Sequence, residues 1–383
     1  MKVLLYCFVA YFEKDIQKIF REQGISYDLL NWTFADKNRD EKFLHHVRHK
    51  IHLRQYDFVV SVNYWPLLSV ICQDAHIPYI AWCYDNPLNV RNIEDTLGNE
   101  VNHVYCFDRI QAETYQKQGF QTVYHLPLAV NSKRLARISP NDAKCSLYHS
   151  QVSFVGKLYE SATTELMHFT DDYCRGYLEA VIRSQRQVYG AYFIDQMLTP
   201  EFMSRINTSF RKDSNTSFVL QPEELNYALA CEVTRRDRIV LLSLCGSRFQ
   251  TKFYSYNDSS VIRGVEKLPP VDYWDEMPYI FAASKINLNP CLRAIQTGIN
   301  LRAFDIMGCG GFLLSNYQEE LAELYVNEED MVLYDSMEDA IEKIRFYLSH
   351  EDLRARIAEN GRRKTLEEHD MTDALAYMFT HNL

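Results

Sequence analysis

The chain of 383 residues is long enough to form two or three domains with large buried cores. Its composition, 47% hydrophobic and 24% charged, excludes a mainly disordered chain, a collagen and a disulfide-dense miniprotein. The net charge of −10 and the absence of a basic run argue against nucleic-acid binding and against a broad electrostatic membrane anchor, while a local peripheral membrane contact stays open.

Short apolar runs alternate with polar stretches of helical spacing in the first third of the chain. Strands are predicted at residues 3–9, 27–32, 58–62, 79–82 and 104–107, and helices at 13–23, 40–54, 67–75 and 109–118. Gly24 and Gly119 end the first and the last of these helices. Continuously apolar strands that alternate with helices indicate a parallel sheet covered on both faces.

The second half begins with a predicted strand at 152–155, followed by a long polar region with few strand signals. We interpret residues 159–236 as a helical insertion, after which strand and helix alternate again. Strands are predicted at 239–244, 285–288, 312–314 and 331–333, and helices at 301–307, 336–348 and 352–368.

This order predicts an α/β fold of two Rossmann-like, doubly wound domains that face each other across a cleft. Residues 1–130 are expected to form the amino-terminal domain. Residues 131–365 are expected to form a ligand-binding domain that carries the insertion. Residues 366–383 are expected to form a terminal helix that crosses back to the first domain.

The ten cysteines are scattered without a Cys-x-x-Cys pair and fall mostly in apolar segments, which is typical of reduced core thiols. The first apolar stretch ends at Glu13 without a small-residue cleavage site. The longest uncharged apolar stretch, residues 58–73, is too short and too polar to span a bilayer. We therefore expect a cytoplasmic protein without a transmembrane segment.

The segment from residue 289 to residue 311 carries most of the chemistry, because it follows a predicted strand and opens a predicted helix. Gly298 allows a close backbone approach, and Asn300 is a good helix N-cap, so the backbone around it forms an anion site. Arg293 and Arg302 can add charge-assisted contacts to a diphosphate. The carboxylate of Asp305 can accept hydrogen bonds from both hydroxyls of a ribose. The alternative is an ordinary crossover in which Arg302 and Asp305 form an i, i+3 pair.

Four stretches of this half, residues 284–289, 298–314, 320–324 and 361–363, resemble the carboxyl-terminal domain of GT-B glycosyltransferases, in the branch of the spore-maturation CgeB-like proteins. Residues 80–87, 104–108 and 125–129 are similar to the amino-terminal half of the same proteins, and 152–157 to the strand that opens their nucleotide-binding half. The resemblance covers most of the chain except the insertion.

The resemblance implies roles for individual residues. Asp305 takes the place of the acidic residue that holds the donor ribose, where glutamate is commoner. The earlier acidic residue of the usual two-glutamate motif is replaced near Gln296 or Thr297. Gly156 and Lys157 match the position where a glycine loop and a basic group approach the diphosphate; a solvent-facing lysine is the alternative.

The remaining donor contacts follow from the same resemblance. Residues 265–273, ending in Tyr273, lie where such proteins approach the base. The backbone from Gly298 through Ile299 to Asn300 is expected to border the phosphates. No Asp-x-Asp sequence is present, and this fold offsets diphosphate charge with a helix dipole and cationic side chains, so no catalytic metal or other cofactor is implied.

Asp85 is the candidate on the acceptor side, because it follows an apolar strand and precedes Asn86 and Pro87. A carboxylate there can orient or deprotonate an acceptor hydroxyl. The alternative is an aspartate that caps a turn before proline. His45, His49 and His52 share one predicted helix face and have metal-ligand spacing, but a polar helix face explains them better.

The resulting hypothesis is a metal-independent, retaining glycosyltransferase that moves a sugar from a nucleotide donor, with a UDP-sugar as the prior, to an acceptor hydroxyl. Asp85, Lys157 and Arg302 are its catalytic candidates. The acceptor is a glycan, a protein or a lipid. The alternative from another class is a non-catalytic nucleotide- or sugar-binding homologue that scaffolds an assembly.

Overall fold

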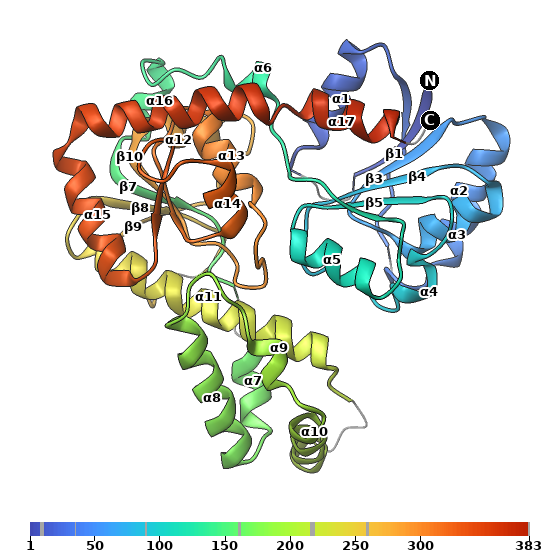
Figure 1. The fold of residues 1–383 in the computed structure, drawn as a ribbon, viewed down its shortest axis with the longest axis horizontal. Helices are drawn as coiled ribbons and strands as arrows, with labels where there is room; N and C mark the ends of the chain where they lie inside the picture. The colour runs from blue at the N-terminus through green and yellow to red at the C-terminus, as the bar shows by residue number, and fades with distance from the viewer. Residues whose placement is uncertain are drawn as a thin grey trace. The chain divides into compact units, whose positions relative to one another are not determined.

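The structure, a computed structural model, describes residues 1–7, 11–34, 36–88, 90–159, 162–214, 219–257 and 260–381. The chain forms two compact units. The first consists of residues 1–132 together with 368–383, and the second of residues 133–367. Each unit is built around its own parallel sheet (Figure 1).

The sheet of the first unit has six parallel strands in the order β2-β1-β3-β4-β5-β6. The strands are β1 (Lys2–Tyr6), β2 (Ser26–Leu29), β3 (Phe58–Val62), β4 (Tyr79–Cys83), β5 (Asn102–Cys106) and β6 (Val123–His125). The predicted strands are confirmed, although residues 30–32 of the second lie beyond the end of β2, and residues 8 and 9 of the first lie outside the described residues. The chain order reverses between β1 and β3, and in an open parallel sheet such a reversal leaves a crevice at the carboxyl ends of the strands.

Helices cover both faces of this sheet. They are α1 (Glu13–Glu22), α2 (Glu41–Leu53), α3 (Pro66–Ala75), α4 (Glu94–Leu97), α5 (Arg109–Lys117) and the terminal α17 (Met371–Thr380). One core joins strand residues such as Leu4 and Val59 to Phe43 of α2 and Leu68 of α3.

The terminal helix α17 packs with the first unit, although it is the last element of the chain (Figure 1). The ring of Phe379 lies 5.9 Å from that of Phe20 on α1 and 5.3 Å from that of Phe58 on β3. The backbone also joins α17 to residue 130, because the N–H of Met371 donates to the carbonyl of Val130. The end of the chain therefore completes the first unit.

A charged cluster fixes the edge strand β2. Both carboxylate oxygens of Asp28 accept a hydrogen bond from Arg54 at 2.8 Å, and the hydroxyl of Tyr56 donates to one of them. The hydrogen bond from Arg54 is the main cause that lowers the pKa of Asp28 to about 2. A carboxyl group with a lowered pKa stabilises the fold above its unfolded pKa and loses that contribution as the pH falls through the folded value.

Replacing Asp28 with asparagine is therefore expected to destabilise the protein at neutral pH by a margin that shrinks between about pH 4 and pH 2. Urea unfolding of the wild type and of Asp28→Asn at pH 7, 5, 4 and 3 measures this margin. An equal margin at pH 7 and pH 3 would show that the shape of the side chain, and not its charge, supports β2.

The sheet of the second unit also has six parallel strands, in the order β12-β11-β10-β7-β8-β9. The strands are β7 (Ser150–Val155), β8 (Thr251–Tyr254), β9 (Glu266–Leu268), β10 (Ser284–Asn289), β11 (Leu313–Asn316) and β12 (Val332–Tyr334). Here the chain order reverses between β7 and β10. The loops that follow these two strands therefore border the crevice of this unit.

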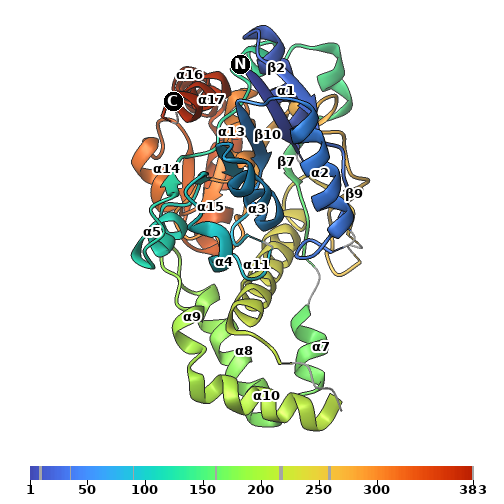
Figure 2. The ribbon, with the colours of Figure 1, turned by 90° about the vertical axis from the view of Figure 1, so that its right-hand side faces the viewer.

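A group of helices forms the insertion between β7 and β8. They are α7 (Ala162–His168), α8 (Asp172–Arg186), α9 (Ile194–Met197), α10 (Pro200–Ser214) and α11 (Pro222–Gly246). The first four gather around one end of α11, and the other end of α11 lies along the sheet (Figures 1 and 2). The insertion has its own core, which includes Leu178, Ile206 and Leu229.

The predicted strand at 239–244 is wrong, because these residues form the last turns of α11. Leu241, Leu242 and Cys245 join the core against β7, β10 and α15 (Met337–Ser349). The helical region consequently ends at Gly246 and not at residue 236. An apolar run of six residues carries no period that distinguishes a buried helix segment from a buried strand.

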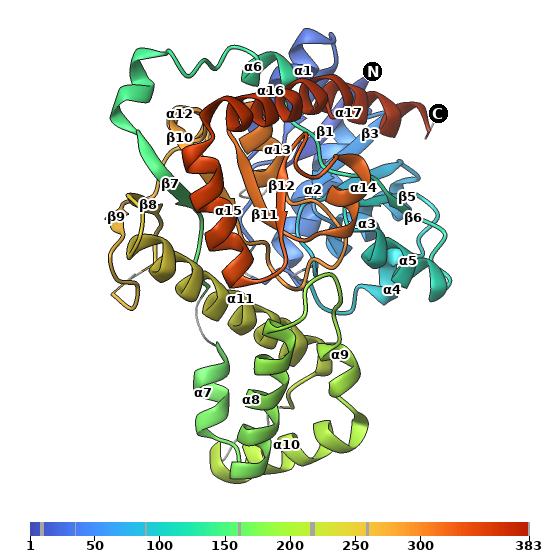
Figure 3. The ribbon, with the colours of Figure 1, turned by 60° about the vertical axis from the view of Figure 1, so that its left-hand side comes forward.

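The remaining helices of the second unit sandwich its sheet. Helices α11 and α15 cover one face, and α12 (Met277–Ala283) and α13 (Leu301–Gly308) cover the other (Figure 3). The unit also contains a 3-10 helix at Ala143–Leu147 and α14 (Glu319–Leu324). Helix α6 (Ser132–Leu135) belongs to it from Lys133 onward, and α16 (Glu351–Glu368) belongs to it up to Glu367. The predicted helices at 301–307, 336–348 and 352–368 are confirmed.

Two further observations concern the described residues of both units. No helix within the described ranges is both long and apolar enough to cross a membrane. All ten cysteines are free thiols, and all except Cys7 are buried.

Candidate functional site

The crevice of the second unit brings together residues that follow β7 and β10. Gly156 comes directly after β7, Asn289 is the last residue of β10, and Arg302 lies in the first turn of α13. The guanidinium of Arg302 donates to the side-chain oxygen of Asn289 at 3.3 Å and lies 5.0 Å from the centre of the Phe154 ring. Three elements thus hold one cationic side chain at the carboxyl edge of the sheet.

Gly156 is required by this arrangement. A Cβ atom at residue 156 would lie 2.8 Å from a guanidinium nitrogen of Arg302 and 2.9 Å from the ring of Phe154. Any larger residue would therefore push the guanidinium away. Gly156 thus has an arginine side chain as its immediate neighbour, and its approach to a diphosphate stays a prediction.

The start of α13 is presented to the same crevice. Asn300 precedes the helix with an extended backbone, but its side chain makes no capping hydrogen bond. It forms a reciprocal pair of amide hydrogen bonds with Asn289, each 3.0 Å long. The side chain of Asn300 therefore does not cap α13, and the positive end of a helix dipole at this point favours an anion.

Three predicted contacts surround this helix start. Lys157 is exposed beside Gly156. Gly298 and Ile299 are buried immediately before Asn300, so any contact they make with a ligand is through the backbone. Thr297 donates a hydrogen bond to the buried carboxylate of Glu320 at 2.8 Å. Thr297, near which the resemblance places the missing glutamate, therefore lies beside the acidic side chain of Glu320 from α14.

Asp305 lies one turn further along α13 and is only 4% exposed. The hydroxyl of Tyr273 donates to its carboxylate at 2.9 Å. Arg134 donates to the same hydroxyl at 3.4 Å and places its guanidinium 4.6 Å from the centre of the Trp274 ring. Burial and the neighbouring charge of Asp305 raise the pKa of the Cys309 thiol. Asp305 is thus the buried anionic centre of an aromatic and cationic cluster.

Arg293 does not point to this cluster. It is 9% exposed, and its guanidinium donates to the carboxylate of Asp237 on α11 at 2.9 Å. It also donates to the carbonyl of Val188 and lies 4.1 Å from the centre of the Tyr189 ring. Burial is the largest single influence and lowers the pKa of Arg293, but the charge and hydrogen bond of Asp237 together with nearby tyrosines raise the pKa overall. The predicted diphosphate ligand is committed to a buried ion pair.

Two functional supports were not found from the sequence. Asn289 opens the segment from residue 289 to residue 311 but received no role of its own there, and Arg238 of α11 lies just before a segment predicted as a strand. Arg238 is buried and donates to the carbonyls of Lys157 and Pro290. It therefore ties together the two loops that border the crevice. The available signal was the arginine of a charged stretch that lies directly before an apolar run.

In the first unit, Asp85 is exposed just beyond the end of β4. The side-chain amide of Asn63, which follows β3, donates to its carboxylate at 2.8 Å. Asp108, at the corresponding position after β5, is buried, accepts hydrogen bonds from Asn86 and caps α5. Of the two strand-end carboxylates, Asp85 is the one that reaches the surface.

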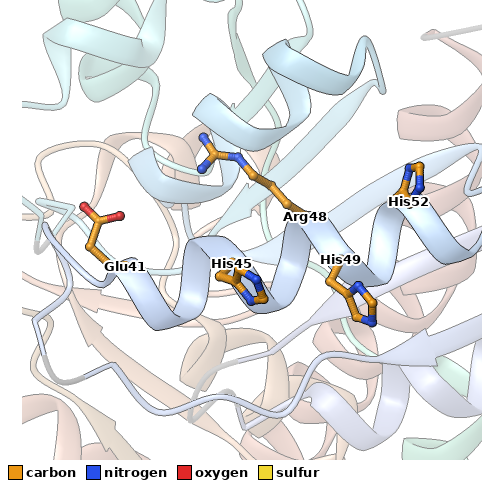
Figure 4. Close-up of a pocket in the computed structure, with 5 residues that line it drawn as sticks. All are labelled: Glu41, His45, Arg48, His49 and His52. Atoms are coloured by element: carbon orange, nitrogen blue, oxygen red, sulfur yellow. The ribbon is translucent and has the colours of Figure 1, made fainter.

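Three histidines of α2, His45, His49 and His52, line an open surface pocket with Glu41 and Arg48 (Figure 4). The rings of His45 and His49 are nearly parallel, with centres 6.4 Å apart, and Arg48 pairs with Asp74 at 3.0 Å. All residues that line the pocket come from one helix, so no second element converges on a ligand. In the described part of the chain, no group of three or more His, Cys, Asp or Glu side chains is placed to hold a metal ion.

Comparison with known sequences finds one matching family model and one distant relative of this chain. Residues 227–380 match a family model described as glycosyl transferase-like. The spore protein CgeB of Bacillus subtilis (strain 168) is 20% identical over 363 residues, which cover 93% of this chain and 89% of CgeB.

Two solved structures are similar over nearly their whole length. Sucrose-phosphate synthase from Thermosynechococcus elongatus has a TM-score of 0.59 at 10% identity and covers 100% of this chain and 99% of its own. Anabaena HepE (Alr3699), solved in complex with UDP-glucose, has a TM-score of 0.56 at 8% identity and covers 99% of this chain and 98% of its own. The chain has the two-domain α/β fold of the GT-B glycosyltransferases, and its carboxyl-terminal part matches the glycosyl transferase-like family.

Proposed function

We propose that the protein transfers a sugar from a nucleoside diphosphate donor, in the first instance a UDP-sugar, to an acceptor hydroxyl. The observation that carries this proposal is the cradle in the second unit, where Gly156, Arg302 and the uncapped start of α13 meet at the reversal of strand order. A positive side chain and a helix N-terminus at one point suit a diphosphate.

The donor contacts lie at the start of α13 and one turn further along it. Arg302, the exposed Lys157 and the backbone from Gly298 to Asn300 stabilise the diphosphate as it leaves. One turn further on, Asp305 holds the ribose in the orientation that Tyr273 fixes by its hydrogen bond. The base lies toward the segment that contains Tyr273. Arg293 acts at a distance, by anchoring the loop between β10 and α13 to Asp237.

The chemical step breaks the bond between the anomeric carbon and the diphosphate oxygen, and the electron pair leaves with the nucleoside diphosphate. The acceptor oxygen forms the new bond to the anomeric carbon and gives up its proton. The resemblance to the CgeB-like branch supports retention of configuration, in which a leaving phosphate oxygen takes that proton. Asp85 orients the acceptor hydroxyl. Stabilising the departing diphosphate electrostatically requires no metal ion in this scheme.

The choice of UDP is supported by the UDP-glucose complex of HepE, whose fold this chain shares. A thermal-shift comparison of UDP-, GDP-, CDP- and dTDP-glucose tests it, because a ligand that binds the native state raises the melting temperature. We expect the largest shift with the UDP donor. A larger shift with another base would replace UDP in the proposal and leave the sugar-transfer function intact.

Slow release of nucleotide from the donor into water, without an acceptor, tests the function itself. Asp305→Asn keeps the volume of the side chain and removes its charge, and we expect it to abolish this release. Asp352→Asn, at an exposed carboxylate in the first turn of α16, is the matched control and is expected to behave as wild type. Donor binding without release from any nucleotide-sugar would support the non-catalytic binding homologue instead.

A further inference from the structure

The first unit has a crevice of the same topological kind, and the donor proposal leaves it unused. Its strand order reverses between β1 and β3. Tyr11 lies in the loop that follows β1, Asn63 directly follows β3, and Asp85 follows the neighbouring β4. These residues come from successive loops at the carboxyl edge of one sheet, where ligands bind in open parallel sheets.

Asn63 acts as a clamp between two of these loops. Its amide nitrogen donates to the carboxylate of Asp85 at 2.8 Å. Its amide oxygen accepts hydrogen bonds from the backbone N–H groups of Tyr84 and Asp85, at 2.8 and 3.0 Å. The backbone of Asn63 has φ 61°, a left-handed conformation that asparagine tolerates better than most residues. The clamp therefore fixes where the exposed carboxylate of Asp85 points.

An aromatic surface lies beside the clamp. The ring of Tyr11 is 6.3 Å from that of Tyr84, and Tyr84 rests 5.5 Å from the ring of the buried Phe12. Tyr11 remains 46% exposed despite these contacts. An exposed ring therefore packs against Tyr84, the residue that directly precedes Asp85 in the chain.

We propose that this edge of the first unit binds an uncharged sugar as the acceptor, with Tyr11 under one face of the sugar ring and Asp85 hydrogen-bonded to its hydroxyls. This inference rests on the proposed glycosyltransferase function and adds the chemical class of the acceptor. A pyranose presents an apolar C–H face and a rim of hydroxyl donors, which match an aromatic ring beside a carboxylate. The charge of Asp85 disfavours an acceptor that carries a phosphate or carboxylate at this point. Asn63 is a positioning residue, because it acts through Asp85.

The test measures binding and turnover separately. Saturation-transfer NMR with the full-length protein and UDP probes methyl glucoside, methyl galactoside, methyl mannoside, N-acetylglucosamine and maltotriose. We expect at least one of these sugars to bind and to accelerate nucleotide release from the donor. Tyr11→Ala is expected to raise the KM for that sugar about tenfold, and Tyr11→Phe is expected to restore it because the ring is kept.

Asn63→Gly removes the clamp and keeps a residue that accepts the left-handed backbone. We expect it to raise the acceptor KM and to leave the KM for the donor unchanged, and a merely structural role would move both. Tyr124→Ala, at another partly exposed tyrosine of the same sheet, is the control for general loss of an aromatic side chain.

The outcomes separate this inference from the proposed function. Release of nucleotide into water, with no binding or acceleration by any of the sugars, overturns the acceptor inference and leaves the glycosyltransferase proposal in place. Acceleration only by a hydroxyl-bearing peptide or by a lipid phosphate in vesicles overturns it as well. Sugar binding that survives Tyr11→Ala and Asn63→Gly unchanged shows that the sugar binds elsewhere and also overturns it.

Discussion

Replacing Arg302 with alanine is expected to lower the rate of nucleotide release about 100- to 1,000-fold. The guanidinium is held at the start of α13 by Asn289, above the ring of Phe154 and against Gly156. A preorganised cation at that point stabilises the charge that develops on the leaving diphosphate. The variant loses this stabilisation in the step in which the diphosphate departs. Initial rates at saturating donor, with UDP detected by a coupled assay, measure the effect.

Gly156→Ala tests the same idea without removing any charge. Its methyl group would displace the guanidinium, since the Cβ position lies 2.8 Å from one of its nitrogens. We expect a smaller loss than in Arg302→Ala, and no additional loss when both changes are combined, because they act on one group. Arg302→Lys keeps the charge but not the planar fork and is expected to recover only part of the rate. Full activity in Arg302→Ala would remove this cradle from the donor site.

The fold was largely predictable from the sequence because its strands are parallel and buried on both faces. Such strands appear as unbroken apolar runs, such as Val59 and Val60 in β3 or Leu313 and Leu314 in β11. Glycines and polar residues at helix starts separate these apolar runs, so the order of strands and helices can be derived from the sequence. The run from Ile239 to Leu244 failed for the same physical reason. It lies in α11 with Leu241 and Leu242 buried and the other residues half-buried, and so short an apolar run shows no period that separates a helix from a strand.

The candidate donor site was predictable in position and less so in its contacts. Chain order placed Gly156 directly after one strand and Arg302 at the start of a helix that follows another strand, and the structure brings the two residues together. The direction of Arg293 depends on a partner, Asp237, that lies 56 residues away in sequence, between the predicted insertion and the run wrongly predicted as a strand. Local spacing contains no information about such a partner. The clamp formed by Asn63 was missed for the same reason, since its meaning depends on the loop after β4.

Removing the carboxylate of Asp237 is expected to destabilise the protein by about 3–5 kcal/mol. Asp237 is 5% exposed and accepts from Arg186 of α8 at 2.9 Å and from Arg293 at 2.9 Å. Asp237→Ala leaves the buried guanidinium of Arg293 without its counter-charge, and an uncompensated buried charge is costly. Urea unfolding monitored by circular dichroism, with each transition fitted separately, measures the loss.

A second variant separates the charge from the packing. In Asp237→Leu combined with Arg293→Met, both members of the buried pair become apolar, and we expect most of the lost stability to return, because such replacements are often neutral. Nucleotide release should nevertheless stay impaired in this double variant. The loop between β10 and α13 would be stable but no longer anchored to α11 by the ion pair, which is the role we assign to Arg293. Loss of less than about 1 kcal/mol in Asp237→Ala would place the pair among ordinary surface contacts and would end that assignment.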